Sequence, residues 1–331
     1  MQKKIKVGIV GAAGYTGGEL IRLLIHHPNV EIIFSHSKSN FGKKIYDVHT
    51  DLLGDTEMEF SEKINDEIDV LFLCLGHGES KMFLAENEIP TSIKIIDLSQ
   101  DFRNNSEPLN LKSEMKWLYG LPELNRDKIK HSNFNIANPG CFATCIQLAL
   151  LPLAKDGLIK DEVHVTATTG STGAGQSLNE TSHFSWRNNN LSTYKNFEHQ
   201  HLLEINQSIK QLQNDFHKEI NFIPHRGNFT RGIFATVYTE CDLNENDAIK
   251  LYENYYAEHP FVHISNKNID LKQVVNTNKS LLFIEKKVDK IIVTSIIDNL
   301  LKGASGQAVQ NMNLLFGLEE TAGLNLKPSA F

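Results

Sequence analysis

A cysteine at the predicted start of a helix is the residue best placed to act as a nucleophile. Cys141 follows Pro139 and Gly140, which predict a tight turn, and the apolar run CFATCIQLALLPLA begins at the cysteine itself. The first turn of a helix offers free backbone N–H groups and the positive end of the helix dipole, and both stabilise a thiolate. The alternative is that Cys141 is a small hydrophobic residue that opens a helix.

The other three cysteines have sequence contexts that favour structural roles. Cys145 lies one helical turn after Cys141, where the helix should already be packed, and a metal pair with Cys141 would lack a third ligand nearby in the sequence. Cys74 lies inside an apolar strand and Cys241 at a strand end. Four cysteines without the spacing of a disulfide framework predict free thiols and a cytoplasmic location.

The stretch NFEHQHLLEI supplies an acid–base partner for a thiol. His201 and Glu204 are three residues apart, so on a helix the carboxylate lies on the same face as the imidazole and could orient it. His199 is the second histidine of the stretch. Two alternatives remain: a solvated helix start, or a zinc site formed by these three residues. A catalytic zinc would leave the thiol without a role, so we predict that no metal is bound.

A glycine-rich turn near the N-terminus predicts a dinucleotide site. The β-rich run IKVGIV (residues 5–10) leads into Gly11, Gly14 and Gly17, and an amphipathic helix follows. Glycines let the backbone approach a pyrophosphate, and the helix N-terminus favours its negative charge. The alternative is a strand–helix turn that simply requires glycine. The full set of predicted cofactor contacts is Gly11, Gly14, Tyr15, Thr16, Gly17, Ser35, Ser37, Lys38 and Asn299.

The end of the second predicted strand favours NADP(H) over NAD(H). An NAD-binding site usually has an acidic residue there for the ribose 2′-hydroxyl, whereas residues 34–44, FSHSKSNFGKK, contain none. Ser35, Ser37 and Lys38 instead offer hydrogen-bond donors and a positive charge, which suit a 2′-phosphate. The alternative is that these lysines are ordinary surface residues.

Two further segments could bind an anionic substrate. Arg103 follows the strand IKIIDLS (93–99), at the strand end where open α/β sheets bind ligands, although it could simply pair with Asp101 or Glu107. Ser171 lies in GSTGAG (170–175), a turn rich in N–H groups that is either an anion nest or only a tight loop.

The order of predicted elements defines an α/β fold with two domains. Strands at 5–10, 30–36, 68–76 and 93–99 alternate with helical stretches, which is typical of a Rossmann-type parallel sheet. After residue 140, predicted strands within 162–175, 231–241 and 290–299 and a helix at 246–259 indicate an α+β domain with a mainly antiparallel sheet. We expect a discontinuous dinucleotide-binding domain, residues 1–140 plus 302–331, and a catalytic and dimerisation domain, residues 141–301. The C-terminal piece of the first domain contains a long amphipathic helix predicted at 302–318.

Composition excludes two classes of partner. The net charge of −7 and the lack of a long basic block argue against nucleic acid. No stretch approaches the roughly 18 apolar residues of a membrane span, so we expect no membrane association.

With these motifs in place, the sequence resembles the N-acetyl-γ-glutamyl-phosphate reductases of arginine biosynthesis. The resemblance covers nearly the whole chain and rests on GAAGYTGGEL, DLSQDFR, YGLPELNR, ANPGCFAT, GSTGAG, HQHLLEI and PHRGNFTRGI, in the expected order. It implies that Cys141 is the nucleophile and His201 the acid–base group with Glu204 behind it, while His199 and Arg103 bind anionic groups of the substrate. The sequence departs from the family pattern at Thr172 and Gln176, and residues 182–197 match no family motif.

The resemblance also implies the reaction. NADPH would reduce N-acetyl-γ-glutamyl phosphate to the semialdehyde through a cysteine thioester, with release of inorganic phosphate. N-succinylglutamyl, aspartyl and acylaminoadipyl phosphates are alternative substrates of the same mechanism. A Cys–His hydrolase or acyltransferase and a non-catalytic NADP-binding protein are the alternatives from other classes. Enzymes of this architecture commonly pair through the second-domain sheet, so we expect a homodimer or homotetramer.

Overall fold

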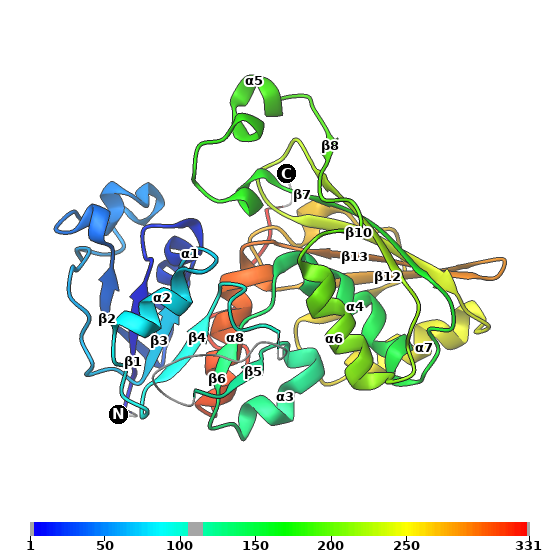
Figure 1. Cartoon of the computed structure of the whole chain (residues 1–331), viewed down its shortest axis with the longest axis horizontal. Helices are drawn as coiled ribbons and strands as arrows, with labels where there is room; N and C mark the ends of the chain where they lie inside the picture. Colours follow the sequence, from blue (N-terminus) through cyan, green and yellow to red (C-terminus); the bar gives the residue numbers. More distant parts are fainter. Residues whose placement is uncertain (1–2, 105–114, 330–331) are drawn as a thin grey trace. The chain divides into compact units, whose positions relative to one another are not determined.

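The chain divides into two compact units, each built around one β-sheet (Figure 1). The structure is a computed structural model that describes residues 3–104 and 115–329. One unit comprises Met1–Pro139 and Ala304–Asn325, and the other comprises Gly140–Gly303 and Leu326–Phe331. The chain therefore leaves the first unit directly before the predicted nucleophile and returns to it for a single C-terminal helix.

The first unit contains a six-stranded, fully parallel sheet, which confirms the Rossmann-type fold predicted from the sequence. The strand order is β2-β1-β3-β4-β6-β5. Its elements are β1 (Ile5–Val10), α1 (Tyr15–Leu24), β2 (Val30–His36), β3 (Val70–Leu73), α2 (Glu79–Glu86), β4 (Lys94–Asp97), β5 (Trp117–Tyr119), α3 (Pro122–Lys130), β6 (Asn135–Ala137) and α8 (Gly306–Leu315).

The order of the first strands creates a ligand-binding position in this sheet. Strand β1 has β2 on one side and β3 on the other, so the chain reverses direction across the sheet after β2. The segments that follow β1 and β3 therefore diverge at the carboxyl edge of the sheet. Open α/β sheets bind ligands at such a switch point, and the predicted glycine turn directly follows β1.

The second unit contains a seven-stranded mixed sheet in the order β11-β12-β13-β10-β7-β9-β8. Pairs β7–β9 and β11–β12 are parallel and the other four pairs are antiparallel. The sheet is therefore mainly antiparallel, as the sequence predicted. Its elements are α4 (Cys141–Lys155), β7 (Val163–Thr169), α5 (Phe184–Arg187), β8 (Ser192–Thr193), α6 (His201–Leu212), β9 (Ile220–Arg226), β10 (Ile233–Glu240), α7 (Glu245–Tyr256), β11 (Val262–Ser265), β12 (Ser280–Lys287) and β13 (Lys290–Ile297).

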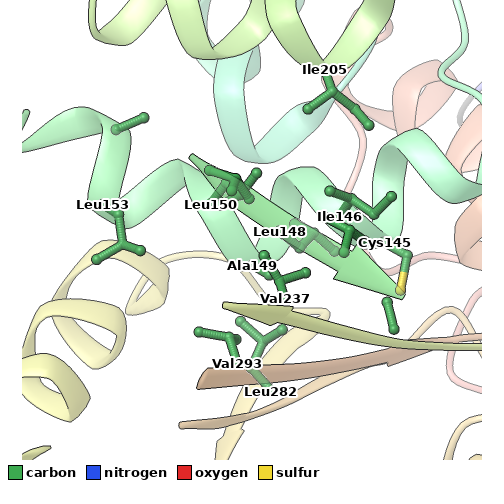
Figure 2. Close-up of a cluster of buried hydrophobic side chains, with 14 of the residues drawn as sticks. Cys145, Ile146, Leu148, Ala149, Leu150, Leu153, Ile205, Val237, Leu282 and Val293 are labelled. Carbon is green, nitrogen blue, oxygen red and sulfur yellow. The ribbon is translucent and has the colours of Figure 1, made fainter. Parts of the chain in front are cut away.

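Helix α4 is the centre of the second unit. Every side chain from Phe142 to Ala154 is buried, because α4 packs against the sheet on one side and against α6 and α7 elsewhere. Figure 2 shows its apolar side chains meeting Val237 of β10 and Val293 of β13. Strand β10 alternates buried and half-buried residues, so one face of the sheet covers α4 and the other face does not.

A proline inside α4 is accommodated by tyrosines of α7. Pro152 has no N–H, so it cannot satisfy the carbonyl of Leu148 four residues earlier. The hydroxyl of Tyr256 donates a hydrogen bond to that carbonyl at 2.6 Å, and Tyr252 donates to the carbonyl of Ala149 at 2.5 Å. The neighbouring helix thus supplies a donor that α4 itself lacks.

Helix α8 differs from the predicted amphipathic helix at 302–318. A π-helical turn at Leu301–Ser305 precedes it, and Gly306 through Leu314 are all buried, including four amide side chains. Two of these amides donate hydrogen bonds to backbone carbonyls of other segments. Asn311 donates to the carbonyl of Gly120 at 2.8 Å, and Asn313 donates to the carbonyl of Ala322 at 2.9 Å. The amide side chains of α8 are therefore internal hydrogen-bonding groups.

In the part of the chain that the structure describes, no helix combines the length and apolar character needed to cross a membrane.

The tyrosine contact to α4 generates a test of stability. We expect Tyr256→Phe to lower the free energy of unfolding by about 1–3 kcal/mol, because it leaves the buried carbonyl of Leu148 without its donor. Adding Pro152→Ala should restore most of the loss, since an alanine at this position supplies the N–H that proline lacks. Urea unfolding followed by circular dichroism measures both, with Tyr238→Phe as the control. A Tyr256→Phe variant as stable as the wild type would contradict this account.

Candidate active site

Cys141 is the first residue of α4, as the sequence predicted, and its side chain is half-buried. Gly140 is the N-cap residue, and no side chain caps the helix in the usual way. The chain also passes close to the thiol at Gly303, where an added Cβ would lie 2.8 Å from the Cβ of Cys141. Only glycine allows that approach, and the predicted site did not include Gly303.

Glu204 connects the turn before Cys141 to helix α6. Its side chain is 2% exposed, and its Oε2 accepts a hydrogen bond from the backbone N–H of Gly140 at 2.9 Å. Its Oε1 lies 3.9 Å from Nε2 of His201. One buried carboxylate therefore holds the N-terminus of α4 and faces the imidazole. The sequence predicted the contact to His201 but not the contact to Gly140.

The two histidines lie together in an aromatic environment. The rings of His199 and His201 are 4.6 Å apart between centroids, and the ring of Phe142 lies 5.4 Å from His199 and 6.3 Å from His201. Since Phe142 follows Cys141 directly, this packing ties the histidines to the first turn of α4. The imidazole and the carboxylate predicted to act with the thiol are thus buried beside the turn and the helix start that carry Cys141.

His199 is held in its neutral form. Its Nδ1 accepts a hydrogen bond from the backbone N–H of His201 at 3.2 Å, so the ring proton lies on Nε2. Burial, with the charges of His201 and Lys195, lowers the pKa of His199 to about 3. At neutral pH this imidazole carries no charge, so it could contact a substrate only as a neutral hydrogen-bond donor. Its Nδ1 is already engaged by the backbone, which also disfavours the zinc-site alternative.

Of the remaining cysteines, Cys145 and Cys241 are buried and Cys74 is half-buried. Sγ of Cys145 donates to the carbonyl of Ser295 at 3.3 Å, and burial raises the pKa of the Cys145 thiol to about 12. Burial likewise raises the pKa of Cys74 to about 12. Cys241 is also buried. The Cys145 and Cys74 thiols are therefore protonated at neutral pH, and Cys241 is shielded by packing, which supports the structural roles predicted for the three residues.

Arg103 is anchored by the backbone of the first unit. It is 5% exposed, its Nε donates to the carbonyl of Asn138 at 2.8 Å, and its Nη2 donates to the carbonyl of Leu98 at 2.7 Å. These two N–H groups form the fork with which arginine binds a carboxylate in a bidentate way. Asp101 accepts from the N–H groups of Gly78 and Lys81, and Glu107 lies outside the described residues. Arg103 therefore braces the carboxyl edge of the sheet.

Ser171 and Asn299 lie in the second unit, in a loop cluster beyond β7 and β13. The N–H groups of Ser171 and Thr172 donate to the carbonyls of Phe229 and Thr230, so these N–H groups are not available for the predicted anion nest. The hydroxyl of Ser171 is the group that could still contact a ligand. The amide of Asn299 accepts from the N–H of Gly232 at 2.7 Å and donates to the hydroxyl of Thr172 at 3.0 Å.

The glycine turn of the first unit fits a pyrophosphate. Gly11 has a φ of 78°, and an added Cβ would lie 2.4 Å from the carbonyl oxygen of Cys74. At Gly17 an added Cβ would lie 2.6 Å from Ala12, so the helix packs directly on the turn. At Gly14, the N-cap of α1, an added Cβ would meet only the Gly11 oxygen, at 3.6 Å. The turn is therefore tight around an accessible helix N-terminus, at which Tyr15 and Thr16 begin the helix.

The end of β2 presents one exposed cation. Lys38 is exposed, whereas Ser37 is 7% and Ser35 0% exposed. The hydroxyl of Ser35 is buried and has no hydrogen-bond partner among the described residues. Of the three residues predicted to receive a 2′-phosphate, Lys38 is the accessible one and Ser35 lies beneath the surface.

Sequence reasoning missed two groups of residues, one in each unit. The segment after β3 reaches the switch point, and there Gly76 N–H donates to Glu79 and Gly78 N–H donates to Asp101. A glycine pair directly after a buried strand was the available signal. The second group is a cluster of Arg187, Tyr194 and Arg226 in the second unit, which the sequence did not mark because residues 182–197 match no family motif.

Comparison with known families follows the same division of the chain. Residues 6–132 match the NAD-binding domain of the semialdehyde dehydrogenases, and residues 141–299 match their dimerisation domain. Solved structures share the fold: aspartate semialdehyde dehydrogenase II of Vibrio cholerae is 16% identical with a TM-score of 0.70, covering 96% of this chain and 99% of that one. Fold and site together define an oxidoreductase of the semialdehyde dehydrogenase class.

Closer relatives identify the branch of this class. Proteins named N-acetyl-γ-glutamyl-phosphate reductase from Christiangramia forsetii and Phocaeicola vulgatus are 59% and 60% identical, over 99% of this chain and 100% of theirs. The chain belongs to the family of N-acetyl-γ-glutamyl-phosphate reductases, as the sequence motifs indicated.

The two contacts of Glu204 can be separated by mutation. We expect Glu204→Ala to lower the free energy of unfolding by about 1.5–3 kcal/mol, because the buried N–H of Gly140 loses a charged acceptor. Glu204→Gln keeps an acceptor for Gly140 but removes the charge beside His201, so it should remain near wild-type stability while kcat/KM falls roughly ten- to a hundredfold. Thermal unfolding and steady-state kinetics measure the two effects. Equal stability losses, or a fully active Glu204→Gln, would argue against this division of roles.

Proposed function

We propose that this protein reduces an N-acyl-γ-glutamyl phosphate, with N-acetyl-γ-glutamyl phosphate as the first candidate, using NADPH and a thioester on Cys141. The observation that carries the proposal is the cluster around the first turn of α4, where the buried carboxylate of Glu204 contacts both Gly140 and His201. The names of the relatives, at up to 60% identity over full length, support the same substrate class.

The residues of the glycine turn would hold the pyrophosphate of the cofactor, and Lys38 would meet a 2′-phosphate. The tight turn at Gly11 and the uncapped helix start at Gly14 fit the former, and the exposed cation at the end of β2 fits the latter. When bound, the nicotinamide supplies the hydride. Asn299 stays a predicted contact to the cofactor.

The reaction begins with covalent catalysis by Cys141. The helix dipole and free N–H groups at the start of α4 stabilise its thiolate, which attacks the acyl carbon of the substrate. A carbon–sulfur bond forms, the bond from that carbon to the phosphate oxygen breaks, and inorganic phosphate leaves with the electron pair. The thioester keeps the acyl group in place for reduction, which a diffusing acyl phosphate would not.

His201 moves the proton in the second half of the reaction. Reduction of the thioester places negative charge on the former carbonyl oxygen, and His201 protonates it to give a thiohemiacetal. His201 then takes this proton back as the carbon–sulfur bond breaks, which releases the aldehyde and restores the thiolate. The Glu204 carboxylate, 3.9 Å from Nε2, stabilises the protonated imidazole between these steps.

We further propose that two or four copies assemble through the second-domain sheet. One face of this sheet covers α4, whereas the other presents half-buried residues such as Phe234 of β10 and Phe283 of β12. The match to a dimerisation domain covers these strands. The cytoplasmic location expected from the sequence stays a prediction.

The reverse reaction tests the proposed chemistry. We expect N-acetylglutamate semialdehyde and NADP⁺ to give NADPH absorbance only when inorganic phosphate is present, because phosphate must resolve the thioester. Cys141→Ser should bind NADPH normally and lower turnover by several decades. A variant that retains more than about a tenth of the activity would rule out Cys141 as the nucleophile. Turnover without a nicotinamide cofactor would instead favour a Cys–His hydrolase.

Cofactor selectivity tests the role of Lys38. We expect Lys38→Glu to raise KM for NADPH by about tenfold or more and to change KM for NADH little, because only NADPH places a 2′-phosphate beside the new carboxylate. Steady-state kinetics with both cofactors measure the ratio, and Lys43→Glu, a nearby exposed lysine, is the matched control. An unchanged selectivity would place the 2′-phosphate elsewhere.

A further inference from the structure

We propose that Arg187, supported by Arg226 and Tyr194, binds a carboxylate of the substrate and so determines which acyl phosphate the enzyme accepts. This inference rests on the proposed function, because it concerns the substrate of the same site. The three residues come from α5, the end of β9 and the segment after β8, all within the second unit.

Arg187 is a buried cation with unused donors. The residue is 8% exposed, and its Nη1 donates to the carbonyl of Gly227 at 3.3 Å. Its Nε and Nη2 are buried and have no hydrogen-bond partner within residues 3–104 and 115–329. A buried N–H group without a partner costs free energy, and the cost is larger for a charged group. A ligand that accepts from both atoms would remove that cost.

The unused atoms have the geometry for a carboxylate. Nε and Nη2 form the edge of the guanidinium whose two N–H bonds run side by side. Another arginine of this protein binds a carboxylate through the same two atoms. Nε and Nη2 of Arg231 donate to the two carboxylate oxygens of Asp298, both at 3.0 Å. Arg187 thus offers to a ligand the pair of atoms that Arg231 uses for an internal carboxylate.

The surroundings of Arg187 are cationic. The guanidinium of Arg226 lies 4.4 Å from the ring centre of Tyr194, and its Nη1 donates to the hydroxyl of Thr181. Burial and the charge of Arg226 lower the pKa of Arg187. Neither arginine forms an ion pair with a described residue. Two neighbouring cations without a carboxylate favour an anionic ligand, since otherwise they repel each other in a poorly solvated place.

Tyr194 connects this cluster to the nucleophile. Its ring centre lies 5.7 Å from that of His199. Burial and then the charge of a Cys141 thiolate raise the pKa of the Tyr194 phenol, whereas the charges of Arg226 and Arg187 lower it. The ring of His199 also lies 5.4 Å from that of Phe142, the residue after Cys141, so ring contacts connect Tyr194 to the first turn of α4. A carboxylate held there would belong to a substrate attached to Cys141.

Two carboxylates could occupy this position. One is the α-carboxylate of the glutamyl group, which every N-acylglutamyl substrate carries. The other is a carboxylate at the end of the N-acyl group, which a succinyl group has and an acetyl group lacks. Both offer the same two oxygens to Nε and Nη2, so substrates that differ in one carboxylate distinguish them.

The experiment compares wild type, Arg187→Lys and Arg187→Met on three aldehydes in the phosphate-dependent reverse reaction. The aldehydes are N-acetylglutamate semialdehyde, its α-carboxamide analogue and N-succinylglutamate semialdehyde. We expect both variants to lose about thirtyfold or more in kcat/KM wherever the carboxylate is present, because lysine keeps the charge but not the paired N–H groups. Arg22→Met, which removes an arginine from the last turn of α1, is the control, and thermal unfolding checks the fold of each variant.

Each pattern of results decides the proposal. Losses on the acetyl and succinyl compounds but not on the carboxamide support it and identify the α-carboxylate. A loss on the succinyl compound alone supports it and identifies the acyl carboxylate. Equal losses on all three, or no loss, overturn it.

A binding measurement separates this inference from the proposed function. If the wild type reduces NADP⁺ with none of the aldehydes, the proposed function fails, and calorimetry with N-acetyl-L-glutamate and N-succinyl-L-glutamate still tests Arg187. Binding of either compound that weakens about thirtyfold or more in Arg187→Lys supports the carboxylate site. Unchanged binding, or no binding to the wild type, overturns it.

Discussion

The buried hydrogen bond from Gly140 N–H to Glu204 is the contact on which the second unit's site depends. The Glu204 side chain is 2% exposed, and burying a carboxyl group costs free energy unless its oxygens have hydrogen-bond partners; the backbone N–H before α4 is one of them. Because that N–H belongs to the residue before Cys141, the contact also sets where the thiol lies. The carboxylate that faces His201 and the turn that carries the nucleophile are therefore positioned together.

The packing of α4 explains why such a contact can be maintained. The helix is buried on all sides by the sheet, α6 and α7, and even the carbonyl released by Pro152 receives a hydroxyl from Tyr256. A helix fixed in this way presents its N-terminus in one place, which a nucleophile needs. His199 contributes in the same manner: as a neutral ring among aromatic groups it holds the first N–H of α6.

Two segments of the chain place polar groups where the sequence pattern did not suggest it. The amides of α8 look like the polar face of a surface helix, yet they bond to carbonyls of the first unit. Arg187 looks like a loop residue, yet it is buried with its carboxylate-binding edge unused by the described residues. In both cases the polar group has a partner, or needs one, that lies far away in sequence or outside the chain. The spacing of polar residues along a sequence can indicate the face of a helix, but it does not show which distant groups these residues bond to.

The sequence by itself determined the class of fold, the nucleophile candidate and the family. These follow from local patterns: the glycine turn after a strand, the cysteine before an apolar helix, and the His-x-His-x-x-Glu spacing at the start of one helix. Only the tertiary structure decided that Glu204 also accepts a hydrogen bond from Gly140. It also decided that Nε and Nη2 of Arg103 donate to backbone carbonyls, whereas the same two atoms of Arg187 have no partner among the described residues. The reason is that a side chain's chemistry depends on burial and on partners, and both are set by contacts between residues distant in sequence.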